Sequence, residues 1–147
     1  MGHDAGMKQS IAVEIAAPAE RVWEVLTDVE QWPEWTETVT SVKRRDEGPL
    51  RPGSRATINQ PKIPETEYIV TQLDPGRAFT WVANGPGVTT TARHDVEVLP
   101  DGRSRVTLAV EQAGPLGAVL GRIYRRLTDR YLSVEAEGIK ARSEGRV

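Results

Sequence analysis

The feature that most constrains the fold is a change in hydrophobic period at Pro115. Between residues 38 and 113, short runs of alternating apolar and polar residues are separated by Gly, Pro, Asp and Asn, which is typical of strands joined by turns. After Pro115 the apolar residues recur every three or four positions, and no proline follows. This pattern predicts one helix of roughly 28 residues, about 42 Å long, which would lie across a whole sheet.

The residues before position 38 predict one strand and two short helices. Residues 8–16 alternate in polarity, with Ile11, Val13 and Ile15 on one side, as in a half-buried strand. Pro18 is suited to the first turn of a helix, where its missing N–H is not needed. We expect this helix to end near Thr27 or Asp28, and residues 28–35 to form a short helical turn that Pro33 breaks.

Six further strands are predicted, at 38–45, 54–60, 68–73, 78–84, 88–99 and 104–113. The segment from Pro61 to Pro64 is predicted to be a loop, because proline cannot donate to a strand ladder. Successive hairpins indicate an antiparallel sheet. We therefore predict an α+β protein with a single domain over residues 8–147. Residues 1–7 are interpreted as a loose N-terminus or an expression remnant.

Composition excludes several classes of site. The chain has 147 residues and no cysteine, and its two histidines are too few for a multi-histidine metal site. We therefore expect no metal and no cofactor. The formal net charge of −2 argues against nucleic acid as a partner. The apolar runs are too short for stable membrane insertion, and the N-terminus lacks a secretory signal. We expect a cytoplasmic protein, either a monomer or a homodimer.

Several short sequence groups resemble a known family by their order and spacing. They are Ala17-Pro18-Ala19-Glu20-Arg21-Val22-Trp23, the segment 28–35, Gly53-Ser54-Arg55, Gln60-Pro61, Phe79-Thr80-Trp81, His94, Asp101-Gly102 and Gly114-Pro115-Leu116-Gly117. Across residues 9 to 142, the chain resembles the polyketide cyclase/dehydrase branch of the START-like (SRPBCC) superfamily. The resemblance implies the helix-grip fold, in which a curved seven-stranded antiparallel sheet wraps around a long C-terminal helix, with two short helices after the first strand.

A cavity between the sheet and the helix is expected on physical grounds. A curved sheet cannot contact a straight helix along its whole length, so a mostly apolar gap remains, which is the usual form of a small-molecule site. The resemblance places Trp32 and Trp35 near the cavity mouth, and we expect at least one of them to fill the core instead. The alternation of side chains along the strands and the apolar side of the C-terminal helix supply the other inward-facing candidates. The predicted ligand-binding residues are Trp32, Trp35, Ile58, Tyr68, Trp81, His94, Gln112, Leu116, Leu120 and Tyr124.

His94 is the best candidate for proton transfer, followed by Tyr68, although the sequence assigns no catalytic residue. Ala92 and Val96 flank His94 on the same side of its strand, so the imidazole should point inward. A hydrogen-bonded interior histidine without a catalytic role is the simpler interpretation.

Three functions remain open at this stage. The first is binding of a small apolar or aromatic, lipid- or polyketide-like ligand in the cavity. The second is a cyclase or dehydratase in which the cavity folds a poly-β-keto chain and His94 or Tyr68 moves a proton. The third is a protein-binding regulator that is similar to chaperone activators.

Two features of the C-terminal segment have structural interpretations. Residues 122–130 contain four arginines and one aspartate, and we expect a solvated helix face there. Gly114, Gly117 and Gly121 are expected to allow close approach of helix and sheet.

Overall fold

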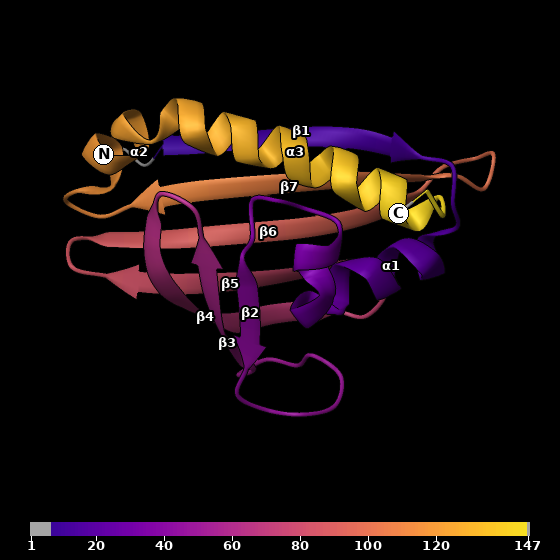
Figure 1. Ribbon diagram of the computed structural model, residues 1–147, viewed down its shortest axis with the longest axis horizontal. Helices are drawn as coiled ribbons and strands as arrows, with labels where there is room; N and C mark the ends of the chain where they lie inside the picture. The colour runs from indigo at the N-terminus through magenta and orange to yellow at the C-terminus, as the bar shows by residue number, and fades with distance from the viewer. Residues whose placement is uncertain (1–6, 147) are drawn as a thin grey trace.

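The computed structural model describes residues 7–146, and its elements follow the predicted order (Figure 1). The strands are β1 (Met7–Ile15), β2 (Ser41–Arg44), β3 (Arg55–Gln60), β4 (Ile63–Asp74), β5 (Ala78–Gly85), β6 (Val88–Val98) and β7 (Ser104–Ala113). The helices are α1 (Ala19–Thr27), the 3-10 helix η1 (Val29–Glu34), α2 (Gly117–Ile123) and α3 (Arg125–Ser143). Residues 1–6 of the expected loose terminus lie outside the described residues, whereas Met7 begins β1.

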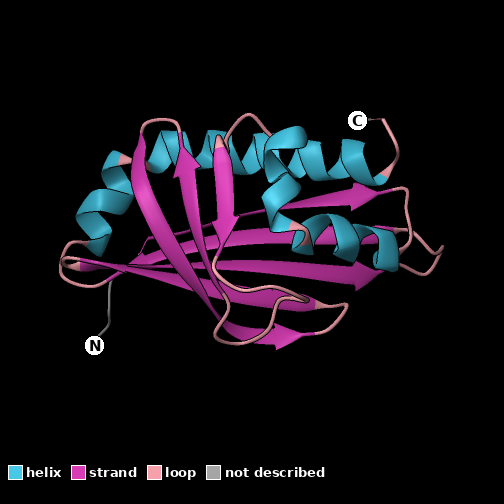
Figure 2. Ribbon diagram, turned by 60° about the horizontal axis from the view of Figure 1, so that its bottom comes forward, coloured by secondary structure: helices cyan, strands magenta, loops and turns pink. Residues whose placement is uncertain are grey.

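Within residues 7–146, seven strands form one antiparallel sheet in the order β1-β7-β6-β5-β4-β3-β2. A register shift between Ile58 and Gln60 interrupts the pairing of β3 with β4, and one between Val70 and Gln72 interrupts the pairing of β4 with β5. Such bulges bend a strand and increase its twist. The sheet curves around α3, and α1 and η1 lie on the same face (Figure 2). This is the predicted α+β helix-grip architecture, which the structure confirms.

Strand β4 begins earlier than the sequence indicates. The predicted loop from Pro61 to Pro64 is a tight turn at residues 61–62, and Ile63 already pairs with Gln60. Strand β5 pairs with β4 only from Ile69 onward. Pro64 therefore lies in a part of β4 that pairs with β3 but not with β5. Its missing N–H interrupts no hydrogen bonding on the β5 side.

The C-terminal helix is interrupted, which corrects the prediction of one continuous helix. The backbone leaves helical geometry at Tyr124, with φ −93° and ψ 7°, and this separates α2 from α3. A Cβ on Gly117 would lie 2.8 Å from the Gln112 carbonyl oxygen, and one on Gly121 would collide with the Met7 side chain. These glycines hold α2 against the ends of β1 and β7, while α3 crosses the sheet. The predicted close approach of helix and sheet is thus confirmed.

The core lies between the concave face of the sheet and the helices. Its largest fully buried side chains include Trp81, Phe79, Ile15, Leu26 and Ile139. Helix α3 contacts the segment after η1 at Gly138, where a Cβ would collide with the Trp35 carbonyl oxygen.

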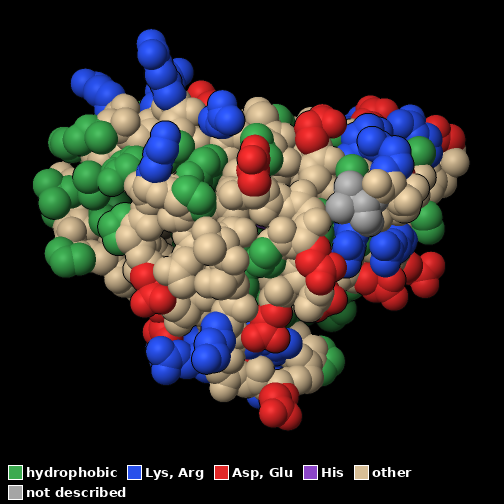
Figure 3. Space-filling model, viewed as in Figure 1, with side chains coloured by type: hydrophobic (Ala, Val, Ile, Leu, Met, Phe, Trp, Pro, Cys, Tyr) green, Lys and Arg blue, Asp and Glu red, His purple; other side chains and the backbone are tan. Residues whose placement is uncertain are grey.

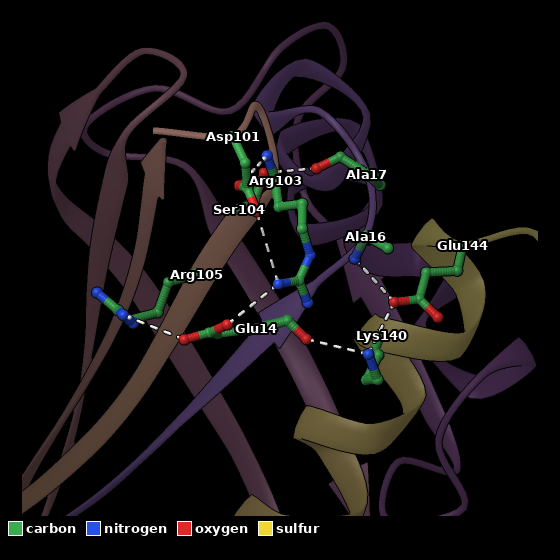
Figure 4. Close-up of polar contacts among 9 residues, drawn as sticks. All are labelled: Glu14, Ala16, Ala17, Asp101, Arg103, Ser104, Arg105, Lys140 and Glu144. Carbon is green, nitrogen blue, oxygen red and sulfur yellow. Dashed lines mark hydrogen bonds and ion pairs between the residues drawn. The ribbon is translucent and has the colours of Figure 1, made fainter. Parts of the chain in front are cut away.

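Polar contacts fasten the end of α3 to β1 (Figure 4). Lys140 Nζ donates to the Glu14 carbonyl oxygen at 3.1 Å and pairs with the Glu144 carboxylate at 2.8 Å. That carboxylate also accepts a hydrogen bond from the Ala16 N–H at 2.8 Å. The hydrogen bond from Lys140, followed by the one from Ala16, lowers the pKa of Glu144 to about 2.

Among residues 7–146, no helix has both the length and the apolar composition needed to span a membrane.

Candidate functional site

A cavity of about 170 Å³ lies between the concave face of the sheet and α3. Its walls come from η1, from strands β3 to β7 and from the middle of α3, together with Val39 before β2. The apolar and aromatic lining includes Trp32, Val39, Ile58, Ile63, Tyr68, Trp81, Ala92, Leu108, Val110 and Leu132. The polar lining includes Gln60, Thr66, Thr90, His94, Gln112, Thr128, Tyr131 and Glu135. A mostly apolar wall with a few converging polar groups is the usual composition of a small-molecule site.

A larger groove of about 620 Å³ lies outside the core, beside α1 and the loop that follows β2. Its charged side chains are largely engaged with one another or with nearby acids, as in the pairs Arg21–Glu24 at 3.8 Å and Arg142–Glu34 at 2.7 Å. The cavity under α3 is the better candidate site, because it lies inside the fold and combines a mostly apolar wall with a few polar groups.

Aromatic rings form one wall of the cavity. Tyr68 stacks on Trp81 with ring centroids 5.2 Å apart and planes 29° apart. Trp32 lies against the same Trp81 ring at 5.4 Å and against His94 at 5.7 Å. These residues come from β4, β5, η1 and β6, so the wall exists only once the sheet has closed over η1. It offers broad, flat apolar contact to a ring-shaped ligand.

His94 is buried and held in one tautomer. Its strand pairs it with Phe79, on whose ring the imidazole stacks at 4.1 Å. Its Nδ1 lies 3.3 Å from the Phe79 carbonyl oxygen. Because a carbonyl oxygen only accepts hydrogen bonds, Nδ1 carries the proton. Burial lowers the pKa of His94 to about 4, so near neutral pH the ring is uncharged, and the lone pair on Nε2 can accept a hydrogen bond.

Glu135 on α3 is a titratable group of the cavity that the sequence interpretation missed. The Thr38 hydroxyl donates to its Oε2 at 2.7 Å, and Thr38 in turn shares a 2.8 Å hydrogen bond with Thr36. Burial raises the pKa of Glu135 to about 7, although the bond from Thr38 opposes this shift. The carboxyl group therefore changes its charge near neutral pH, inside an aromatic cavity.

Tyr68 supplies a third polar group. Burial, and secondly the nearby Glu135 carboxylate, raise the pKa of Tyr68 to about 12. The phenol consequently stays protonated at physiological pH and can donate a hydrogen bond. The cavity thus combines an acceptor at His94, a donor at Tyr68 and a carboxyl that can do either.

The structure brings together six of the ten predicted ligand-binding residues: Trp32, Ile58, Tyr68, Trp81, His94 and Gln112 line the cavity. Trp35 does not: it packs in the core and lines the outer groove beside α1 instead. Leu116, Leu120 and Tyr124 do not line it either, because α2 lies at the end of the sheet, beyond the break at Tyr124.

The helical side of the cavity comes instead from α3. Thr128, Tyr131, Leu132 and Glu135 are spaced three and four residues apart and share one face. The sequence shows this spacing, but the apolar pattern alone does not indicate Thr128 and Glu135, because both are polar.

Tyr131 also connects α3 to the turn between β3 and β4. Its hydroxyl donates to the Pro61 carbonyl oxygen across the cavity edge. The next residue, Lys62, has a φ of 68°, which is uncommon for a residue with a side chain. This contact holds the hairpin against the helix.

Comparisons with known proteins agree with this architecture. Among solved structures, the Zhui aromatase/cyclase from a Streptomyces species is similar, with a TM-score of 0.80, 18% identity, and coverage of 97% of this chain and 96% of the other. A hypothetical protein from Helicobacter pylori has a TM-score of 0.76 and 16% identity, covering 95% of this chain and 88% of the other. At these identities the likeness concerns the fold. No curated protein gives a significant match. The family model described as polyketide cyclase/dehydrase and lipid transport matches residues 7–144, so the chain belongs to that family.

Proposed function

We propose that the protein binds a small aromatic or otherwise apolar molecule that carries an oxygen substituent, in the cavity between the sheet and α3. The observation that carries this proposal is the convergence of His94, Tyr68 and Glu135 on one aromatic-walled cavity. The family's description, which covers polyketide cyclases, dehydrases and lipid transport, supports a ligand of this class.

The size of the cavity sets the scale of the ligand. At about 170 Å³ it is similar in volume to an apolar cavity of about 150 Å³ that was engineered in another protein and binds benzene. A ligand with one or two rings fits this volume. A longer chain would extend past the Tyr131–Pro61 contact, which closes the edge formed by the β3–β4 turn and α3.

The polar groups of the cavity favour ligands that carry a hydroxyl or carbonyl group. A ligand hydroxyl can donate to His94 Nε2, and a carbonyl oxygen can accept from the Tyr68 phenol or the protonated Glu135 carboxyl. Each such bond contributes about 1 kcal/mol, or roughly five- to tenfold in affinity. An unsubstituted hydrocarbon would leave these groups without partners.

Matched ligand pairs test the binding proposal. Calorimetry and thermal unfolding should be measured with benzene and phenol, and with naphthalene and naphthol. At a ligand concentration of 100 times the dissociation constant, binding stabilises the fold by about 2.7 kcal/mol. We expect the hydroxylated member of each pair to bind more tightly.

The variant His94→Phe keeps the ring area but removes the acceptor, so its preference for the hydroxylated member of each pair should be smaller than that of the parent. Tyr68→Phe is the matched control for the phenol hydroxyl. If none of the four compounds binds, or if hydrocarbon and alcohol bind the parent protein equally, the proposal is wrong.

A second candidate function is acid–base catalysis of cyclisation or dehydration in the same cavity. It is favoured because one cavity is lined both by an uncharged His94 and by a carboxyl group whose pKa is about 7. In a dehydration, His94 Nε2 would take the proton from the carbon beside the carbonyl. The Glu135 carboxyl would protonate the departing hydroxyl, which leaves as water while the carbon–carbon double bond forms.

A β-hydroxy ketone with one aromatic ring is a suitable probe for this second function, because its dehydration produces a conjugated, absorbing enone. Turnover should require His94 above its pKa of about 4 and Glu135 below its pKa of about 7, so the rate should be greatest between these values. Glu135→Gln should abolish turnover while retaining binding. Turnover that is unchanged in this variant would rule out the catalytic assignment.

A further inference from the structure

The segment around α2 carries an exposed apolar surface that the cavity does not use. Leu116, Val119 and Ile123 are 46%, 54% and 68% exposed. Their spacing of three and four residues places them on one side of the helix. Pro86, exposed in the turn between β5 and β6, lies next to them, since the Leu116 N–H donates to the Gly87 carbonyl oxygen at 2.7 Å.

We call Pro86, Leu116, Val119 and Ile123 the apolar tip. Figure 3 shows hydrophobic side chains gathered at the end of the molecule that carries α2, with Lys and Arg side chains along the adjoining edge. A patch of this kind with a polar rim marks an interaction site rather than ordinary surface.

Four exposed arginines border the apolar tip: Arg122, Arg125, Arg126 and Arg130. Within residues 7–146, none of them forms an ion pair, whereas Arg103 and Arg105 at the opposite end both pair with Glu14 at 3.3 and 3.2 Å. Asp129 is the only acid in the stretch 115–130, and it accepts a hydrogen bond from Gln9 Nε2 at 2.7 Å. This end of the molecule therefore carries a local positive charge, although the whole chain is slightly negative.

We propose that the apolar tip and its arginines dock this end of the protein on the surface of an anionic lipid bilayer. Val119 and Ile123 would lie among the outer parts of the acyl chains, and the arginines would contact lipid phosphates. Such a contact is interfacial and requires no membrane-spanning segment. It is also independent of the proposed function, because none of the four residues of the apolar tip lines the cavity.

The charge pattern favours a bilayer over other occupants. In a two-fold contact between copies of this chain, the same patch would lie on both sides and the two sets of arginines would face each other. Nucleic acid would neutralise the arginines but would leave Val119 and Ile123 in water. An anionic bilayer provides both an apolar phase and phosphates, in the arrangement that the tip requires.

Cosedimentation with vesicles tests the proposal. The parent protein should bind vesicles of phosphatidylcholine with roughly one third phosphatidylglycerol, but not phosphatidylcholine alone. Val119→Ser with Ile123→Ser should weaken this binding roughly tenfold or more, because two buried apolar side chains are lost. Arg125→Gln with Arg126→Gln should weaken it roughly tenfold or more, and high salt should weaken the parent's binding in the same way.

Matched controls lie elsewhere on the surface. Val98 is as exposed as Ile123, at 68%, and lies at the end of β6 that is distant from the Pro86 turn, so Val98→Ser should bind as the parent does. Arg77→Gln, at another exposed position, is the control for charge. Absence of binding to anionic vesicles, or equal binding to both kinds of vesicle, would overturn the proposal.

Two further outcomes would assign the tip to another partner and also overturn the proposal. One is a change in oligomeric state, seen by sedimentation velocity, in the Val119→Ser, Ile123→Ser variant. The other is retention on duplex DNA that depends on Arg125 and Arg126 but not on the two apolar residues.

Discussion

Replacing Glu135 by Gln should make the protein more stable at alkaline pH than the parent. The folded state holds the carboxyl pKa at about 7, above its ordinary value of 4.5, because α3 turns this group away from water into the cavity. At pH values above 7 the folded protein must therefore carry a buried carboxylate whose Thr38 hydrogen bond only partly offsets burial. Glutamine has nearly the same shape and keeps an oxygen for the Thr38 hydroxyl, but it has no charge to bury.

The size of the effect follows from linkage. A raised pKa in the folded state means that the folded protein binds more protons than the unfolded chain between about pH 4.5 and 7, so stability falls as pH rises through this window. The full displacement corresponds to about 3 kcal/mol, of which about 2.5 kcal/mol falls between pH 5 and pH 8. The hydrogen bonds changed by the substitution add a constant offset of about 1 kcal/mol, which does not depend on pH.

His94 has the opposite effect on the parent protein. Its folded pKa is lowered to about 4 from an ordinary value of 6.5, so its contribution is present above pH 6.5 and is lost as pH falls toward 4. Between about pH 4.5 and 6.5, the opposite effects of Glu135 and His94 on the parent's free energy of unfolding nearly cancel. In Glu135→Gln the contribution of His94 is no longer opposed, so the stability of that variant should rise with pH up to about 6.5.

Urea unfolding, followed by tryptophan fluorescence at several pH values from about 5 to 8, measures this difference directly. The free energy of unfolding of Glu135→Gln minus that of the parent should increase by about 2.5 kcal/mol across the range. Glu137→Gln, at an exposed position on the same helix, is the control and should show no such increase. A difference between Glu135→Gln and the parent that stays constant from pH 5 to pH 8 would refute the reasoning.

Three further predictions concern packing and polar contacts. Gly138→Ala should destabilise the fold by about 3 kcal/mol in urea unfolding, because the added Cβ meets the Trp35 carbonyl oxygen; a loss below 0.5 kcal/mol, roughly the effect of a surface substitution, would contradict this packing. Asp46→Ala should cost about 2–3 kcal/mol, since it removes the partner at 3.2 Å from an Arg44 side chain that is 14% exposed; an unchanged urea midpoint would show that the ion pair is dispensable. Tyr131→Phe removes the hydrogen bond to the β3–β4 turn, so amide hydrogen exchange in that turn should become faster while global stability falls by about 1 kcal/mol; unchanged exchange there would mean that the hydroxyl does not hold the turn.

The alternation of polarity along β6 and β7 was sufficient to place His94 and Gln112 on the cavity side. In a strand, side-chain direction follows from position alone, and the hydrophobic neighbours at alternate positions show which side is buried. The same logic placed Ile58, Tyr68 and Trp81, even though register shifts interrupt the β3–β4 and β4–β5 pairings. The order of the strands and of the C-terminal helical segment likewise followed from local pattern and turn residues.

The helical side of the site depended on contacts between distant parts of the chain. Helical period predicted an apolar stripe from residue 115 onward but could not show that Gly117 and Gly121 bind α2 to the end of the sheet. The helix breaks at Tyr124, and the cavity wall is formed by residues of α3 instead of Leu116 and Leu120.

Glu135 shows the same limit most clearly. A glutamate on a helix surface is ordinarily solvated, and nothing next to it in the sequence indicates otherwise. Its carboxyl group meets Thr38, 97 residues earlier in the chain, and the aromatic wall of the sheet, and the burial that results raises its pKa although the hydrogen bond from Thr38 opposes this shift. The sequence by itself determined the order and type of the elements and the faces of the strands, since these depend on neighbours along the chain. Only the tertiary structure decided which charged group lies inside the cavity, because desolvation depends on what surrounds a side chain in space.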